Sequence, residues 1–182
     1  MEAKRLDRDL SVTEQVAPSD LADAARAGFR AVICNRPDGE GADQPNFSEI
    51  EAAARAAGLE ARYLPVESGK VSDGDAAAFD AALSALPKPV LAYCRTGTRS
   101  ATLWSLSEGA KGRPLPEILS ATKAAGYDMN GAARRIAAGG RISAADAAAD
   151  LLEGHAQGPR VDGQAAPGRQ GGRLSGEAGP AS

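Results

Sequence analysis

Short apolar runs alternate with segments of helical periodicity over the first half of the chain. Four runs have the length of buried strands, at residues 10–13, 29–35, 59–66 and 89–93. Three segments place apolar residues at helical spacing, at residues 19–27, 46–57 and 73–86. Strands that alternate with helices predict an α/β fold, with a mainly parallel sheet flanked by helices on both faces.

The second half of the chain predicts helices without further strands. After a break at residues 109–114, helices are expected at 115–125 and 130–138, with a further helical stretch at 143–153. From Gly154 onward, glycine, proline, alanine and glutamine dominate, so this tail is predicted to be disordered. The expected division is one domain over residues 1–108, a helical extension over 109–153 and a tail over 154–182.

Composition narrows the class of protein. Hydrophobic residues make up 43% of the chain but aromatic residues only 4%, so we expect a modest core built from leucine, valine and isoleucine. A net charge of −3 gives no electrostatic reason to expect nucleic acid or a membrane as partner. The first residues are charged and resemble no signal peptide, and two cysteines fit a reducing compartment, so a cytoplasmic location is predicted. His155 is the single histidine, which argues against a metal site.

The candidate chemistry lies directly after the fourth predicted strand. There the chain reads Cys94-Arg95-Thr96-Gly97-Thr98-Arg99-Ser100 and continues into an apolar segment at 101–106, which indicates a strand, a tight loop and a helix start. Backbone N–H groups converge in such a loop, and the helix N-terminus adds partial positive charge. That field favours a thiolate and a bound oxyanion. Cys94 is therefore predicted to be a nucleophile that faces an anion-binding cradle.

Each neighbour of Cys94 has a predicted role in this cradle. Arg95 and Arg99 are expected to converge on the anion, and Ser100 either caps the helix or donates to the thiolate. The remaining anion-binding candidates are loop residues: Thr96, Gly97 and Thr98.

A second loop is expected at the same edge of the sheet. Asn35 and Arg36 follow the second strand, where they either brace the Cys94 loop or line its rim, and the acids of residues 38–40 could pair with Arg36 or Arg99. Cys34 either forms a disulfide that resolves oxidised Cys94 or is a buried strand residue.

The spacing of the motif separates two chemistries. Cys94 to Arg99 is Cys-x4-Arg, which resembles the Cys-Arg-x-Gly-x-Arg loop of single-domain rhodanese-type sulfurtransferases and is one residue shorter than the Cys-x5-Arg of protein-tyrosine phosphatases. Tyr93 stands where those phosphatases usually have histidine. A phosphatase also needs a general acid, for which Glu67 is the candidate, with Asp73 or Asp75 as alternatives. Sulfur transfer needs no such acid, so these features favour sulfur transfer.

Two segments together resemble one bacterial family. Residues 31–40 and 92–100 are similar to the phosphatase-like domain often described as a sulfur transferase, which also precedes lactamase-like persulfide dioxygenases in beta-lactamase hydrolase-like proteins. The resemblance covers about residues 6–107 and implies a fold similar to dual-specificity phosphatases. It implies that Cys94 carries a persulfide without a cofactor, and that Arg95 and Arg99 bind thiosulfate, a low-molecular-weight persulfide or another small sulfur anion. Since residues 108–182 are too few for the lactamase-like domain, any dioxygenase partner is expected to be a separate polypeptide.

The predicted function is therefore a rhodanese-like sulfurtransferase that passes sulfane sulfur through a persulfide on Cys94. The alternative is a phosphatase of the tyrosine or dual-specificity type that uses the same thiolate. A second alternative is a non-catalytic anion-binding or docking module, with residues 109–153 as the partner surface.

Overall fold

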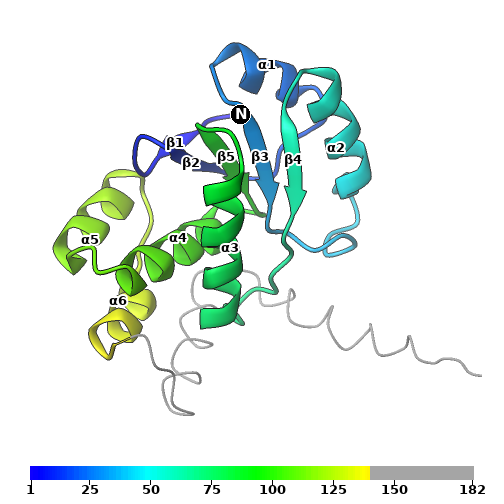
Figure 1. Cartoon of the computed structure of the whole chain (residues 1–182). Coiled ribbons are helices and arrows are strands. Elements are labelled where there is room, and N and C mark those ends of the chain that lie inside the picture. The colour runs from blue at the N-terminus through cyan, green and yellow to red at the C-terminus, as the bar shows by residue number, and fades with distance from the viewer. Residues whose placement is uncertain (140–182) are drawn as a thin grey trace, which may run out of the picture.

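The computed structural model describes residues 1–139, and within them eleven elements follow one another as the sequence predicts, with one addition (Figure 1). The strands are β1 (Lys4–Arg5), β2 (Leu10–Thr13), β3 (Ala31–Cys34), β4 (Glu60–Tyr63) and β5 (Val90–Tyr93). The helices are α1 (Asp20–Arg26), α2 (Phe47–Ala56), α3 (Asp73–Ala85), α4 (Thr98–Ala110), α5 (Leu115–Ala124) and α6 (Asn130–Ala137). The helix expected at 143–153 and the tail from Gly154 lie outside the described residues.

The strands form one sheet in the order β1-β2-β5-β3-β4. All pairs are parallel except β1 with β2, where Lys4 pairs with Val12. The two-residue strand β1 was not predicted, because two residues are too few to produce a hydrophobic pattern. The mainly parallel α/β fold is confirmed.

Two cores cover the two faces of the sheet. On one face, Val32, Cys34, Leu91 and Tyr93 pack with residues of α1 and α2. On the other face, the alternate strand residues pack with α3, α4, α5 and α6. Because neighbouring strand residues point to opposite faces, this alternation decides which side chains can reach which loop.

Helix ends are set by local chemistry. Ser72 accepts a hydrogen bond from the Asp75 N–H at 3.0 Å, and Asp75 accepts one from the Ser72 N–H at 3.0 Å, so the two residues form a capping box at the start of α3. Helix α4 begins at Thr98, inside the Cys94 motif and earlier than the apolar segment at 101–106 suggests, with Gly97 as its N-cap. Ser100 therefore lies in the first turn of the helix and does not cap it.

The helical extension is continuous with the rest of the described fold. The expected boundary at residue 108 falls within α4, which continues to Ala110. Ile118 and Met129 from the extension belong to the same core as Val12 and Trp104. None of the helices within residues 1–139 is long and apolar enough to cross a membrane.

Candidate active site

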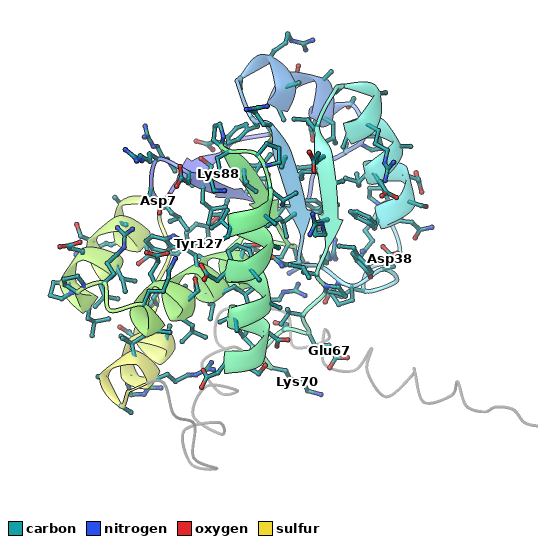
Figure 2. All side chains as sticks on the ribbon, viewed as in Figure 1. Asp7, Asp38, Glu67, Lys70, Lys88 and Tyr127 are labelled. Atoms are coloured by element: carbon teal, nitrogen blue, oxygen red, sulfur yellow. The ribbon has the colours of Figure 1, made fainter. Side chains whose placement is uncertain are left out.

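The carboxyl ends of β3, β4 and β5 meet at one edge of the sheet, because these strands are parallel and adjacent. The loops that leave them, at residues 35–46, 64–72 and 94–97, therefore lie together. Asp38 and Glu67 mark this edge in Figure 2. In parallel α/β sheets this edge is where ligands bind.

Cys94 lies at the end of β5 with its side chain buried, and the residue is 1% exposed. The Gly97 N–H donates to the Cys94 Sγ at 3.1 Å. Gly97 has a φ of 96°, a conformation that glycine adopts readily and other residues rarely do. This turn brings the N-terminus of α4 to the sulfur, so the loop has the geometry expected of a thiolate cradle.

The two arginines of the motif occupy different environments, although they were expected to converge. Arg99 is 6% exposed, and its Nη1 and Nη2 donate to the two carboxylate oxygens of Glu40 at 2.7 and 2.8 Å. Nη1 also donates to the Val66 carbonyl at 3.0 Å. Arg95 is exposed. The structure therefore fixes Arg99 beside the loop and leaves Arg95 at the surface.

Glu40 joins two of the three arginine candidates of the site, Arg99 and Arg36. Its carboxylate, 2% exposed, also accepts from the Arg36 Nε at 2.8 Å, while the Arg36 Nη1 donates to Gln15 at 3.1 Å. Burial works to raise the pKa of Glu40, but the hydrogen bonds and charges of Arg99 and Arg36 outweigh it and hold the pKa below its usual value. The sequence predicted that an acid of residues 38–40 could pair with Arg36 or with Arg99, and in the structure Glu40 pairs with both arginines.

Asn35 braces the site from beneath. It is 0% exposed, its Nδ2 donates to the Leu64 carbonyl at 3.0 Å, and its Oδ1 accepts from the Ser100 hydroxyl at 2.8 Å. These bonds tie the end of β3 to the segment after β4 and to the first turn of α4. Because the one hydroxyl proton of Ser100 points to Asn35, Ser100 supports the loop and does not donate to Cys94.

The candidate acids lie at different places around the edge. Glu67 follows Val66, whose carbonyl accepts a hydrogen bond from Arg99. The Glu67 carboxylate pairs with Lys70 at 3.2 Å. Asp75 belongs to the capping box of α3, and Asp73 pairs with Arg135 at 3.1 Å. Of the three, Glu67 lies on the segment that Arg99 contacts.

Cys34 and Tyr93 pair in register, and both face the core beneath α1 and α2. The Cys34 thiol donates to the Arg36 carbonyl at 3.2 Å. Burial raises the pKa of Cys34 to about 11, and burial together with the nearby Cys34 raises the pKa of Tyr93 far above its usual range. A resolving role for Cys34 stays a prediction, and this raised pKa works against it because few thiolates are present at neutral pH.

Two further residues reach the loop without having been predicted. The Gln15 N–H donates to the Arg95 carbonyl at 3.2 Å, and the Tyr127 hydroxyl donates to the Thr96 carbonyl at 3.2 Å. Gln15 follows a strand beside β5, so the parallel order of strands could have indicated it. Tyr127 lies on the connection between α5 and α6, where the sequence offers only an isolated aromatic residue after Gly126.

The arrangement combines a buried sulfur at a helix N-terminus with a fixed guanidinium group, which suits a nucleophile that attacks a small oxyanion. Residues 1–139 contain no group of three or more histidine, cysteine, aspartate or glutamate side chains placed to hold a metal ion.

Comparisons with known proteins agree with this geometry. The family model described as "Beta-lactamase hydrolase-like protein, phosphatase-like domain" matches residues 2–111. The beta-lactamase hydrolase-like protein of Agrobacterium fabrum is 33% identical over 135 residues, which cover 74% of this chain but 31% of that relative. The chain thus matches less than a third of that relative's length.

Solved structures are similar over most of the fold. A putative phosphatase from Neisseria meningitidis has 34% sequence identity and a TM-score of 0.67, over 72% of this chain and 94% of that one. The structure of TpbA from P. aeruginosa in complex with pTyr, at 17% identity and a TM-score of 0.55, covers 83% of this chain and 88% of that one, and shares the fold. These neighbours have folds of the protein-tyrosine and dual-specificity phosphatase type.

Proposed function

Because the chain belongs to the family of the phosphatase-like domain of beta-lactamase hydrolase-like proteins, we propose that it is a cysteine-dependent phosphatase of the tyrosine or dual-specificity type. The observation that carries the proposal is the hydrogen bond from Arg99 to the Val66 carbonyl. That bond holds the segment of Glu67 against the Cys94 loop, so a nucleophile, a guanidinium group and a carboxyl group come from adjoining segments. A phosphatase needs all three.

In the proposed reaction the Cys94 thiolate attacks the phosphorus atom of a phosphoester. A sulfur–phosphorus bond forms, the bond from phosphorus to the leaving oxygen breaks, and the leaving oxygen takes a proton from the Glu67 carboxyl. Water then gives a proton to the Glu67 carboxylate and attacks the phosphorus atom, a phosphorus–oxygen bond forms, and the sulfur–phosphorus bond breaks, which releases phosphate and returns both the Cys94 thiolate and the Glu67 carboxyl. The Gly97 N–H and the α4 N-terminus stabilise the sulfur in both steps, while Arg99, oriented by Glu40, balances charge on the phosphoryl oxygens.

Sulfur transfer is the second candidate, and two observations favour it. The loop is Cys-x4-Arg, one residue shorter than the usual phosphatase loop, and the Glu67 carboxylate is paired with Lys70. In this reaction the Cys94 thiolate attacks the outer sulfur of thiosulfate, a persulfide forms and sulfite leaves. A thiol or cyanide then takes the sulfur, and a separate persulfide dioxygenase is the partner we propose for this route.

Two assays run side by side separate these candidates. Hydrolysis of p-nitrophenyl phosphate and thiosulfate:cyanide transfer are measured for the wild type, Cys94→Ser and the matched control Cys34→Ala. The phosphatase proposal expects hydrolysis that Cys94→Ser abolishes and Cys34→Ala retains. Transfer without hydrolysis, with one sulfur atom added to Cys94 in the mass spectrum after thiosulfate treatment, would select the sulfurtransferase. If the wild type shows neither hydrolysis nor sulfur transfer, the anion-binding module is favoured.

The role of Glu67 has its own test. Glu67→Gln removes the proton donor, so hydrolysis of phenyl phosphate is expected to fall by about 100-fold. Hydrolysis of p-nitrophenyl phosphate should fall much less, because p-nitrophenolate leaves without protonation. An equal loss for both substrates would assign Glu67 a structural role instead.

A further inference from the structure

The loop that carries the Cys94 sulfur is also held from its outer side. The Thr96 carbonyl and the Gly97 N–H belong to one trans peptide unit, so they point in opposite directions. The Gly97 N–H donates to the Cys94 Sγ at 3.1 Å. On the opposite side of the loop, the Thr96 carbonyl accepts a hydrogen bond from the Tyr127 hydroxyl at 3.2 Å. A single peptide unit therefore links the phenol to the sulfur.

Two segments that are far apart in the sequence meet against this loop. The Gln15 N–H donates to the Arg95 carbonyl at 3.2 Å, so the preceding peptide unit also has its carbonyl held by a donor from outside the loop. A Cβ added at Gly97 would collide with the Tyr127 hydroxyl and lie 3.3 Å from the Thr13 carbonyl. The end of β2 and the helical extension thus both contact the turn at Gly97.

Tyr127 lies on the connection between α5 and α6 and is itself fixed there (Figure 2). Its N–H donates to the Thr122 carbonyl at 2.9 Å, and Met129 is buried in the core that α4 shares with the sheet. Burial, followed by the charges of Cys94 and Glu14, raises the pKa of Tyr127 to about 12. The hydroxyl is consequently a protonated donor at neutral pH.

The glycine in this turn gives the outer hydrogen bond its importance. Gly97 has a φ of 96°, and glycine adopts negative φ values about as readily. Rotation of the peptide unit would therefore meet little backbone strain, and it would turn the Thr96 carbonyl oxygen toward the sulfur. That partly negative oxygen would repel a thiolate, whereas the N–H group stabilises it. A donor on the carbonyl opposes the rotation and also polarises the peptide unit, which makes its N–H a stronger donor.

We propose that Tyr127 is a positioning residue, whose hydroxyl keeps the Gly97 N–H directed at the Cys94 sulfur and so stabilises the thiolate. The inference rests on the proposed function only in that Cys94 is the nucleophile. Tyr127 does not contact the sulfur and acts through the peptide unit between them. The helical extension thereby prepares the nucleophile from outside the motif.

Amide exchange and alkylation test the proposal without turnover. Tyr127→Phe removes only the hydroxyl, and Tyr63→Phe is the matched control, because the Tyr63 hydroxyl accepts from the Asp38 N–H at 2.9 Å at the same edge of the sheet. In the full-length chain at neutral pH, NMR measures hydrogen exchange of the Gly97 amide, and mass spectrometry measures alkylation of Cys94 by iodoacetamide. We expect Tyr127→Phe to speed the exchange about two- to tenfold and to slow the alkylation by a similar factor. Tyr63→Phe should change neither rate.

Other results overturn the proposal. If both rates stay unchanged in Tyr127→Phe, the hydroxyl does not hold the peptide unit. If exchange rises equally at Gly97 and at Leu91 in β5, Tyr127 only adds to overall stability. If exchange rises at Gly97 alone and alkylation is not slowed, the N–H group does not stabilise the reactive thiolate. Failure of the proposed nucleophile has a separate signature: Cys94 of the wild type would react no faster than in the unfolded chain, which would remove the role of Tyr127 as well.

Discussion

Glu40 neutralises the two largely buried guanidinium groups of Arg36 and Arg99, so both the stability and the geometry of the site depend on its negative charge. Glu40→Gln keeps the shape but leaves Arg36 and Arg99 without their shared carboxylate. We expect the free energy of unfolding to fall by about 3 kcal/mol, because breaking a buried ion pair leaves an uncompensated charge. Hydrolysis should also fall at least about tenfold, since the guanidinium of Arg99 loses its fixed orientation.

The matched control is Glu51→Gln, which removes the same charge from an exposed pair with Arg55 on α2. That substitution should change the free energy of unfolding by less than about 1 kcal/mol. Urea unfolding of both variants measures the difference. Equal effects would mean that Glu40 does not act as a buried charge.

The lowered pKa of Glu40 also predicts how stability depends on pH. Its carboxyl has a lower pKa in the folded chain than in the unfolded chain, so the unfolded chain binds the proton first as the pH falls. The stabilisation is fully present at neutral pH, begins to fall below about pH 5, and is lost progressively as the pH falls through the lowered pKa of the folded chain. The difference in melting temperature between wild type and Glu40→Gln should therefore shrink from pH 7 to pH 3.5. A difference that does not depend on pH would contradict this assignment.

The two cysteines should differ sharply in reactivity. With its pKa raised to about 11, Cys34 holds fewer than about one thiolate in a thousand molecules at pH 7.5. Iodoacetamide should therefore label Cys94 in the native chain and leave Cys34 unlabelled, as peptide mass spectrometry can determine. The Cys94→Ser variant is the control and should take up no label until it is unfolded. Rapid labelling of Cys34 would instead restore its candidacy as a resolving thiol.

At the scale of the elements, the turn from β5 into α4 depends on Gly97. Gly97→Ala puts a Cβ into the Tyr127 hydroxyl and onto a residue with a φ of 96°. We expect a loss of more than about 1 kcal/mol in the free energy of unfolding and a large loss of Cys94 reactivity, because the turn must open.

Gly74→Ala in the first turn of α3 is the matched control. Its Cβ would meet only the Ser72 hydroxyl, at 3.7 Å, so this variant should be neutral or slightly more stable. The double variant Gly97→Ala/Tyr127→Ala should recover only part of the loss, since the positive φ remains. Full recovery would show that the collision alone matters.

The same turn shows how far the sequence could predict this site. The apolar run before Cys94 and the loop residues after it were enough to place a strand end and a tight loop around the Cys94 sulfur, while the role of Cys94 as a nucleophile stays a prediction. The start of α4 within the motif was not predicted, because Thr98, Arg99 and Ser100 show no helical apolar period. Contacts between distant segments, such as that of Asn35 with Ser100, depend on the order of the strands in the sheet. Hydrophobic periodicity predicts the fold class but not that order.

The motif alone also could not decide between the two chemistries. Loop length and Tyr93 favoured sulfur transfer, whereas the family and the solved neighbours support a phosphatase. Position 93 explains part of this difference. Tyr93 faces the α1–α2 core with Cys34, so it does not contact the cradle and says little about the anion bound there.

At the scale of the whole molecule, α5 and α6 complete both the core and the site. Ile118 and Met129 fill the core beside α4, and the ring of Tyr127 covers the Cys94 loop. Arg113, just before α5, lies over the Trp104 ring with 5.6 Å between its Cζ and the ring centroid. The helical extension is thus expected to be required for folding, in addition to any role as a partner surface.

A pair of truncations tests this requirement. A chain that ends at residue 113 lacks all of α5 and α6 and exposes the apolar face of α4. The lost burial of Ile118 and Met129 by itself is worth about 3–6 kcal/mol. Since a domain of this size is stable by only about 5–15 kcal/mol, we expect this truncated chain to be unfolded or to aggregate. A chain that ends at residue 139 keeps every contact described above, and should retain the wild-type melting temperature and Cys94 labelling. Circular dichroism melting of both chains measures the outcome, and a cooperative transition near that of the wild type in the shorter chain would make the extension an independent appendage.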